Sequence, residues 1–242
     1  MATYVIVHGG RAGGWYFQES ERLMRAAGQE VYRPTLTGIG ERMHLGSPDV
    51  NLDTHIQDIV NVLVYEDLWD VLLVGYSYGG MVISGVAEVV PERIVQLIYL
   101  DVLVPRDGES MADLLPEFVA AMEEVADAVG DGWQIPHDPP HPRKTPHPLN
   151  TWKHPIILAN ADAARLPRTY VLFTRNSFSF APFLAKTVAR VQADGGATVN
   201  LPLITRHRRM IQERLPICSW IWRKGMIGNT SVRQHQCQLR DG

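Results

Sequence analysis

The stretch Gly75-Tyr76-Ser77-Tyr78-Gly79 decides the fold of this 242-residue chain. It follows the apolar run 71–74 and precedes the helix-like segment 81–87. A strand, a tight turn and a helix in this order predict a nucleophile elbow, in which the turn strains the serine backbone and exposes its hydroxyl above a sheet. Small residues on both sides let the strand and the helix pass close together. Ser77 is therefore the candidate nucleophile.

Around this stretch, strands alternate with helices. Apolar and β-branched runs predict the strands, and apolar residues at helical spacing predict the helices between them. We expect strands over 4–7, 31–36, 71–74, 94–100, 169–174 and 197–204, and helices over 15–27, 52–65 and 182–193. This alternation predicts an α/β fold with a mainly parallel central sheet, helices on both faces and ligands at the carboxyl ends of the strands.

Three parts of the chain differ in character. Residues 1–104 form the first part of the core, and 167–242 form its second part with an atypical tail. Between them, 105–166 combine an acidic helical stretch (111–129) with a proline-rich loop (136–155), which predicts a lid or cap insertion. The histidines of this insertion lack a metal-ligand pattern, so we expect them to lie in a solvated loop; they are His137, His141, His147 and His154. For the earlier His44 and His55 we expect a structural or surface role.

Charge and cysteine content exclude several classes of protein. A net charge of −3 argues against a nucleic-acid partner, which requires a dense basic face. The chain has neither a signal segment nor an apolar run of bilayer length, so we expect no membrane partner and a cytoplasmic location. Cys218 and Cys237 provide neither a disulfide framework nor a metal-ligand spacing. We expect no metal and no cofactor, and the sequence leaves the oligomeric state open.

The glycine-rich segment His8-Gly9-Gly10, followed by 11–15, is a candidate oxyanion loop. Its backbone N–H groups can approach a substrate oxygen because few side chains block them. A flexible turn is the alternative interpretation. The glycine spacing does not match a dinucleotide-binding fingerprint.

Ser77 needs a base to take its proton, and the base needs a carboxylate to orient it. His207 follows the last predicted strand and fits the chain order serine, acid, histidine. Asn176 follows the strand 169–174, but its amide cannot offset the positive charge of an imidazolium. Asp101 ends the strand 94–100 at the same expected edge of the sheet, and a strand-capping role is the alternative for it.

Residues 4–210 resemble the α/β-hydrolase fold, in the small branch that holds plant methyl esterases, hydroxynitrile lyases and related bacterial esterases. The resemblance rests on 8–10 with 14–15, on 35–42, on 52–55, on the elbow with Gly80, and on 99–101. It implies an oxyanion hole from the backbone N–H groups of Gly10 and Tyr78, and a Ser77–His207 nucleophile and base pair. The family's acid normally follows the strand that is here 169–174, where this chain has Asn176. The position of Asp101 resembles that of the acid in some haloalkane dehalogenases, so we choose Asp101 as the acid.

The tail departs from the family pattern. Its segment 205–210 matches the family's Thr-Gly-His-Asp-Ala-Met only at Thr205, His207 and Met210. From 205 to 242 there are eight Lys or Arg and two Asp or Glu, and Pro216 interrupts the expected amphipathic helix. We hypothesise a frameshift in this stretch, which resequencing of the source DNA would test.

Together these features predict a serine carboxylic-ester hydrolase that acts through an acyl-enzyme on small to medium esters. Aromatic candidates for the substrate pocket are Trp15, Tyr76, Trp133 and Trp152. Lactone hydrolysis would use the same residues. A hydroxynitrile lyase is an alternative, although Gly9 replaces the threonine that such lyases use. A non-catalytic binder of small ligands is a third alternative, favoured by Asn176 and the altered tail.

Overall fold

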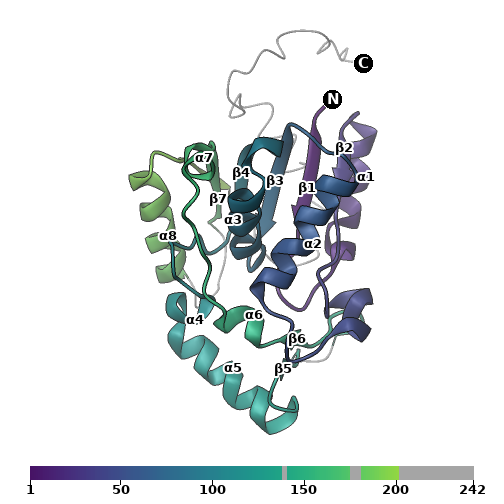
Figure 1. Ribbon diagram of the computed structural model, residues 1–242, viewed down its shortest axis with the longest axis vertical. Coiled ribbons are helices and arrows are strands. Elements are labelled where there is room, and N and C mark those ends of the chain that lie inside the picture. Colours follow the sequence, from purple (N-terminus) through teal and green to yellow (C-terminus); the bar gives the residue numbers. More distant parts are fainter. Residues whose placement is uncertain (138–140, 175–180, 202–242) are drawn as a thin grey trace.

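The computed structural model describes residues 1–137, 141–174 and 181–201. Within these ranges, six parallel strands form one sheet in the order β2-β1-β3-β4-β7-β8 (Figure 1). The strands are β1 (Thr3–Val7), β2 (Glu30–Tyr32), β3 (Val71–Tyr76), β4 (Ile94–Leu100), β7 (Arg168–Phe173) and β8 (Ala197–Leu201). The predicted α/β fold with a parallel central sheet is confirmed.

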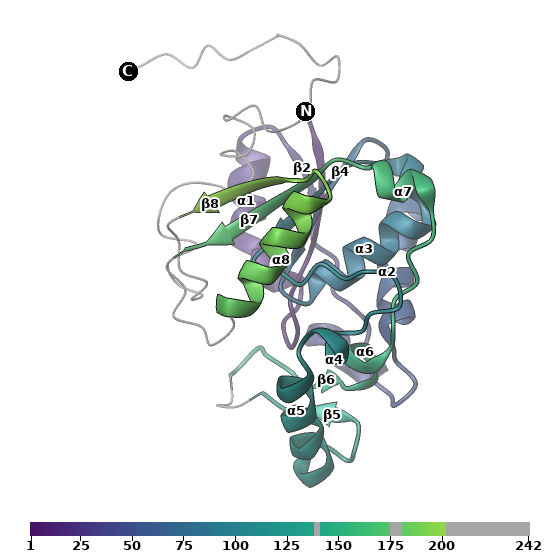
Figure 2. The same ribbon diagram turned by 90° about the vertical axis from the view of Figure 1, so that its left-hand side faces the viewer.

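Helices cover both faces of this sheet (Figures 1 and 2). One face carries α2 (Leu52–Tyr65), α3 (Gly79–Val89) and α8 (Ala181–Ala193), and the other carries α1 (Gln18–Ala26). Side chains alternate between the two faces along β1, as the pleat of a strand requires. Val5 and Val7 belong to the buried cluster that includes α2 and α3, whereas Tyr4 and Ile6 pack in a second cluster with Met24 of α1.

Short helical turns and caps set the boundaries of several elements. The region 15–27, where one helix was expected, forms a 3₁₀ turn, η1 (Gly14–Phe17), followed by α1. Two further 3₁₀ turns are η2 (Gly40–Leu45) and η3 (Pro91–Arg93). β2 ends at Tyr32 rather than Leu36, because Pro34 has no N–H for the strand ladder. α2 begins as expected, with a reciprocal capping box between Asn51 and Thr54.

The insertion 105–166 lies mostly beyond the carboxyl ends of the strands (Figures 1 and 2). It contains α4 (Met111–Leu114), α5 (Pro116–Val129), α6 (Asn150–Lys153), α7 (Ala161–Arg165) and an antiparallel pair, β5 (Gln134–Ile135) with β6 (His147–Pro148). The single helix expected over 111–129 is divided at Leu115, because the following Pro116 disfavours a helical backbone at the residue before it. No helix in the described part of the chain is long and apolar enough to cross a bilayer.

Candidate active site

The elbow has the geometry that its sequence predicts. Ser77 lies between β3 and α3 with φ of 52°, in the left-handed region that non-glycine residues rarely adopt. Its N–H donates to the carbonyl of Leu100 (3.3 Å), and its own carbonyl accepts from Gly80 N–H (3.1 Å). The residue is exposed although both elements around it are buried. The strained turn therefore presents the Ser77 hydroxyl at the edge of the sheet.

Two glycines make this close turn feasible. A Cβ on Gly79 would stand 2.6 Å from the carbonyl oxygen of Val7, and a Cβ on Gly75 would stand 2.7 Å from the carbonyl oxygen of Gly79. Both contacts are with backbone, which cannot rotate away. The small residues of the motif are thus required by the passage of α3 across β1 and β3.

The glycine loop after β1 reaches the same place. A Cβ on Gly9 would approach the Cβ of Ser77 to 3.0 Å, and Gly10 follows directly. Gly9, Gly10, Ser77 and Tyr78 all line one cavity of about 410 Å³. The structure therefore brings both predicted oxyanion residues next to the predicted nucleophile.

The buried imidazole of His8 holds this loop. Its Nδ1–H donates to the carbonyl of Gly9 (2.8 Å), and its Nε2 accepts from the N–H of Leu36 (3.1 Å). Burial lowers the pKa of His8 to about 4, so the ring is neutral near pH 7. His8 is a structural residue that orients the backbone of the loop.

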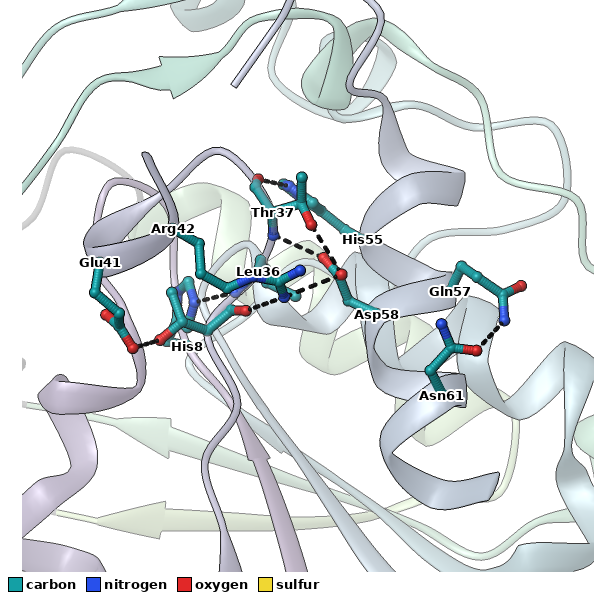
Figure 3. A network of polar contacts seen from close by, with 10 residues as sticks. His8, Leu36, Thr37, Glu41, Arg42, His55, Gln57, Asp58 and Asn61 are labelled. Atoms are coloured by element: carbon teal, nitrogen blue, oxygen red, sulfur yellow. Dashed lines mark hydrogen bonds and ion pairs between the residues drawn. The ribbon is translucent and has the colours of Figure 1, made fainter. Parts of the chain in front are cut away.

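The segment 35–42, one of the stretches that carries the family resemblance, supports the loop through a polar network. Asp58 on α2 accepts from the N–H of Thr37 (2.7 Å) and from Arg42 (3.1 Å), as Figure 3 shows. Arg42 also donates to the carbonyl of Thr35 (2.7 Å), whose hydroxyl accepts from Gly14 N–H (2.7 Å). This segment is thus tied both to α2 and to the glycine loop.

Asp101 occupies the end of β4 and lines the cavity with Ser77. Its φ is 50°, and its N–H donates to the carbonyl of Val171 (2.9 Å) on β7. One carboxylate oxygen accepts from the N–H of Phe173 (3.3 Å). The side chain therefore both bridges β4 to β7 and reaches the cavity. His207 and Asn176 lie outside the described residues.

The predicted pocket aromatics divide into two groups. Tyr76 and Trp152 line the cavity, whereas Trp15 and Trp133 are not among its lining residues. Trp15 stacks on His141 with ring centroids 5.9 Å apart. The insertion contributes a large share of the wall, and its lining residues are Leu115, Phe118, His137, Lys144, Met111 and Trp152. Of these, only Trp152 was predicted from the sequence, because the positions of the others depend on how the insertion folds back on the sheet.

Two buried histidines, His55 and His147, lie next to the predicted oxyanion residue Tyr78. Tyr78 donates its hydroxyl proton to Nδ1 of His55 (2.9 Å), whose Nε2–H donates to the carbonyl of Thr37 (2.8 Å). The N–H of Arg11 donates to Nδ1 of His147 (3.3 Å). Burial lowers the pKa of both rings, that of His55 to about 4 and that of His147 well below its usual value. A structural role for His55 is confirmed.

The expectation of a solvated loop is wrong for His147. The side chain is fully buried, because β6 pairs with β5 and places the ring between Tyr78 and Trp152. Its Nε2–H donates to the hydroxyl of Thr151 (2.7 Å). The prolines around His147 favoured the prediction of an irregular loop, and no local pattern in the sequence indicated that the ring is buried. Among the described residues, no group of three His, Cys, Asp or Glu side chains could hold a metal ion.

A family model described as the alpha/beta hydrolase family matches residues 4–217. The chain belongs to the alpha/beta hydrolase family. The carbendazim hydrolyzing esterase of Nocardioides sp. is 37% identical over 193 residues, which cover 71% of this chain and 80% of that protein. A pyrethroid hydrolase of Sphingobium wenxiniae is 29% identical over 110 residues, and this match spans 45% of this chain but 38% of that protein.

Solved structures of alpha/beta hydrolases share the fold. An extracellular alpha/beta-hydrolase from a Paenibacillus species, described as a structural and functional homologue of tobacco salicylic acid binding protein 2, superposes with a TM-score of 0.73. The two sequences are 21% identical, and the superposition covers 95% of this chain and 100% of that chain. The family resemblance carried by the elbow, the glycine loop and the segment 35–42 is confirmed.

Proposed function

We propose that this alpha/beta hydrolase is a serine carboxylic-ester hydrolase that works through an acyl-enzyme on small to medium esters. The observation that carries the proposal is Ser77, an exposed serine in a strained turn that opens into a 410 Å³ cavity beside a glycine loop. Relatives named as esterases and hydrolases support the same reaction class.

In the proposed mechanism, Ser77 Oγ attacks the ester carbonyl while His207 takes the hydroxyl proton. The backbone N–H groups of Gly10 and Tyr78 stabilise the oxyanion of the tetrahedral intermediate. The carbon–oxygen bond to the alcohol then breaks, and His207 returns the proton to the departing alcohol. Water, activated by the same base, releases the acid and restores Ser77. Asp101 is proposed to orient His207 and to offset its positive charge.

The insertion 105–166 is proposed to act as a cap over the substrate. Its residues supply much of the apolar wall of the cavity, among them Leu115, Phe118 and Trp152. Such a wall would exclude water from the acyl-enzyme and would select the acyl chain by shape. A cytoplasmic location and a small-molecule partner stay predictions of the sequence.

Labelling with a fluorophosphonate, followed by peptide mass spectrometry, tests the nucleophile. We expect one adduct on Ser77 and no label in Ser77→Ala. Ser84→Ala is the matched control, because Ser84 lies on α3 but bonds the carbonyl of Gly80 (2.8 Å) and does not line the cavity. It should label like the wild type. Absence of an adduct on Ser77 in folded protein would refute the mechanism and favour a ligand binder.

A panel of p-nitrophenyl esters of rising chain length, aryl esters, lactones and carbendazim tests the substrate class. Cyanide release from a cyanohydrin, measured in parallel, tests the lyase alternative. We expect ester turnover that disappears in Ser77→Ala. Cyanide release without ester turnover would contradict the proposal.

A further inference from the structure

Two cationic side chains, Arg11 and Lys144, line the cavity that contains Ser77. Arg11 follows the glycine loop after β1, whereas Lys144 belongs to the insertion, 133 positions later in the chain. Both side chains are partly buried. Within the described ranges, neither forms an ion pair with a carboxylate. The cavity wall also carries the carboxylate of Asp101, but neither cation is ion-paired with it or with another carboxylate in the part of the chain that the structure describes.

The backbone holds these two residues side by side. The carbonyl of Arg11 accepts from the N–H of Thr145 (3.2 Å), the residue after Lys144, while the N–H of Arg11 donates to His147 (3.3 Å). Arg11 has φ of 60°, in the left-handed region that non-glycine residues rarely adopt. These contacts with the insertion compensate for that strain and fix Arg11 at the cavity.

The guanidinium of Arg11 contacts groups that do not neutralise it. Its Nη2 donates to the sulfur of Met122 (3.2 Å), and its Cζ lies 5.6 Å from the centre of the Trp152 ring. By contrast, Arg42 and Arg190 pair with Asp58 (3.1 Å) and Glu109 (2.7 Å). Burial lowers the pKa of Arg11 and of Lys144, and the charge of Arg11 lowers that of Lys144 further. An anion bound between them would relieve both the repulsion and the desolvation.

We propose that Arg11 and Lys144 form a carboxylate subsite, so that the favoured substrates are monoesters of short dicarboxylic acids. The planar guanidinium can bind a carboxylate through two parallel hydrogen bonds, and the lysine adds a point charge. Arg11 is the residue after Gly10, so a short acyl chain can place its ester carbonyl at Ser77 and its free carboxylate at the two cations. This inference rests on the proposed esterase function and names its substrate class.

The reaction is ordinary hydrolysis of the ester end. Ser77 Oγ forms a bond to the carbonyl carbon as the bond to the alcohol breaks, and the serine proton leaves with the alcohol. Water then adds its oxygen to the acyl carbon, the bond from that carbon to Ser77 Oγ breaks, and one water proton returns to Oγ as the dicarboxylic acid leaves. The free carboxylate takes no part in bond making and serves to position the acyl chain. No oxidant or further reactant is needed.

The test compares monomethyl glutarate with methyl pentanoate, which has the same number of acyl carbons but no charge. Methanol release gives kcat/KM for each ester. In the wild type we expect kcat/KM for the charged ester to exceed that for the uncharged ester by about ten- to a hundred-fold, mainly because its KM is lower. This is the range that hydrogen bonds to charged groups supply. Arg11→Met and Lys144→Met should each lower this ratio at least several-fold. Arg143→Met is the matched control, because this arginine lies over Trp15 (4.3 Å) and does not line the cavity; it should keep the ratio.

Two outcomes would overturn the subsite. One is a wild-type ratio of one or less, and the other is a ratio that both methionine variants leave unchanged. Calorimetric titration of glutarate into each folded protein gives a readout that does not require turnover. Binding to the wild type that Lys144→Met weakens would support the subsite even if neither ester were hydrolysed. Failure of Ser77 labelling would instead refute the esterase function, so the two failures are distinguishable.

Discussion

Gly79→Ala should disturb the elbow through one methyl group. The new Cβ would lie 2.6 Å from the carbonyl oxygen of Val7 and 3.0 Å from that of His8. Cβ atoms do not come closer than 3.0 Å to other heavy atoms, so α3 must move away from β1 by about 0.4 Å. Because both contacts are with backbone of the central sheet, the first turn of α3 has to move, and Tyr78 moves with it.

This displacement has consequences for stability and for activity. Overpacking of a core typically costs about 1–3 kcal/mol, while replacing glycine by alanine in a helix returns up to about 1 kcal/mol. We expect the free energy of unfolding to fall by about 1 kcal/mol. A catalytic site tolerates shifts of about 0.5 Å, and a 1 Å misplacement can cost about a hundred-fold. We therefore expect kcat/KM for p-nitrophenyl acetate to fall about ten-fold.

Urea denaturation and steady-state kinetics measure the two effects separately. Gly85→Ala is the control within the same helix, because its Cβ would meet the Ile56 side chain (Cδ1 at 2.1 Å and Cγ1 at 2.7 Å) rather than the backbone of the sheet, and Ile56 does not line the cavity. That variant should keep the wild-type kcat/KM whatever its stability. Full activity and unchanged stability in Gly79→Ala would refute the reasoning, as would an equal loss of activity in Gly85→Ala.

Other perturbations test the acid, the buried histidines and a helix cap. Asp101→Asn should lower turnover by several orders of magnitude, up to about 10⁴-fold, while the far-ultraviolet circular dichroism stays native; near-normal activity would exclude Asp101 as the acid. His8 and His55 have folded pKa values of about 4, below the unfolded value of 6.5, so the unfolded state binds more protons and stability is lost as the pH falls from about 6.5 to 4. Each ring should contribute about 2 kcal/mol of this loss at pH 5. Denaturation at pH 7 and pH 5 should therefore show that the stability of His55→Gln falls less with pH than that of the wild type. An equal fall in both proteins would contradict the lowered pKa of His55. Asn51→Ala removes the acceptor of Thr54 N–H (3.0 Å) at the start of α2 and should lower the free energy of unfolding by about 1 kcal/mol. Thermal denaturation measures this change. A stability equal to that of the wild type would show that the cap is dispensable.

Local patterns predicted most of the core correctly. The strands before and after Ser77, the capped start of α2 and the end of β4 before Asp101 follow from short runs of residues, and the structure has them within a few residues. The misplaced boundaries share a cause. Pro34 ended a strand and Pro116 divided a helix, in each case because proline restricts its neighbours or lacks an N–H group.

The residues of the elbow needed no tertiary information, because a strained serine between glycines is a property of five consecutive residues. The cavity is different. Its wall joins Gly10 and Ser77 of the core to Lys144 and Trp152 of the insertion, and such contacts between distant segments leave no periodic signal in a sequence. For the same reason the burial of His147, which sits among prolines, was missed.

Sequence alone therefore predicted the reaction class and proposed Ser77 as its nucleophile, because the exposure of the serine hydroxyl depends on a local backbone conformation. Tertiary structure decided what surrounds that nucleophile. Packing of the insertion against the carboxyl ends of the strands placed Lys144 beside Arg11 and created the charge of the cavity. Charge and shape of a cavity arise from segments that meet only on folding, and they select the substrate that the elbow can attack.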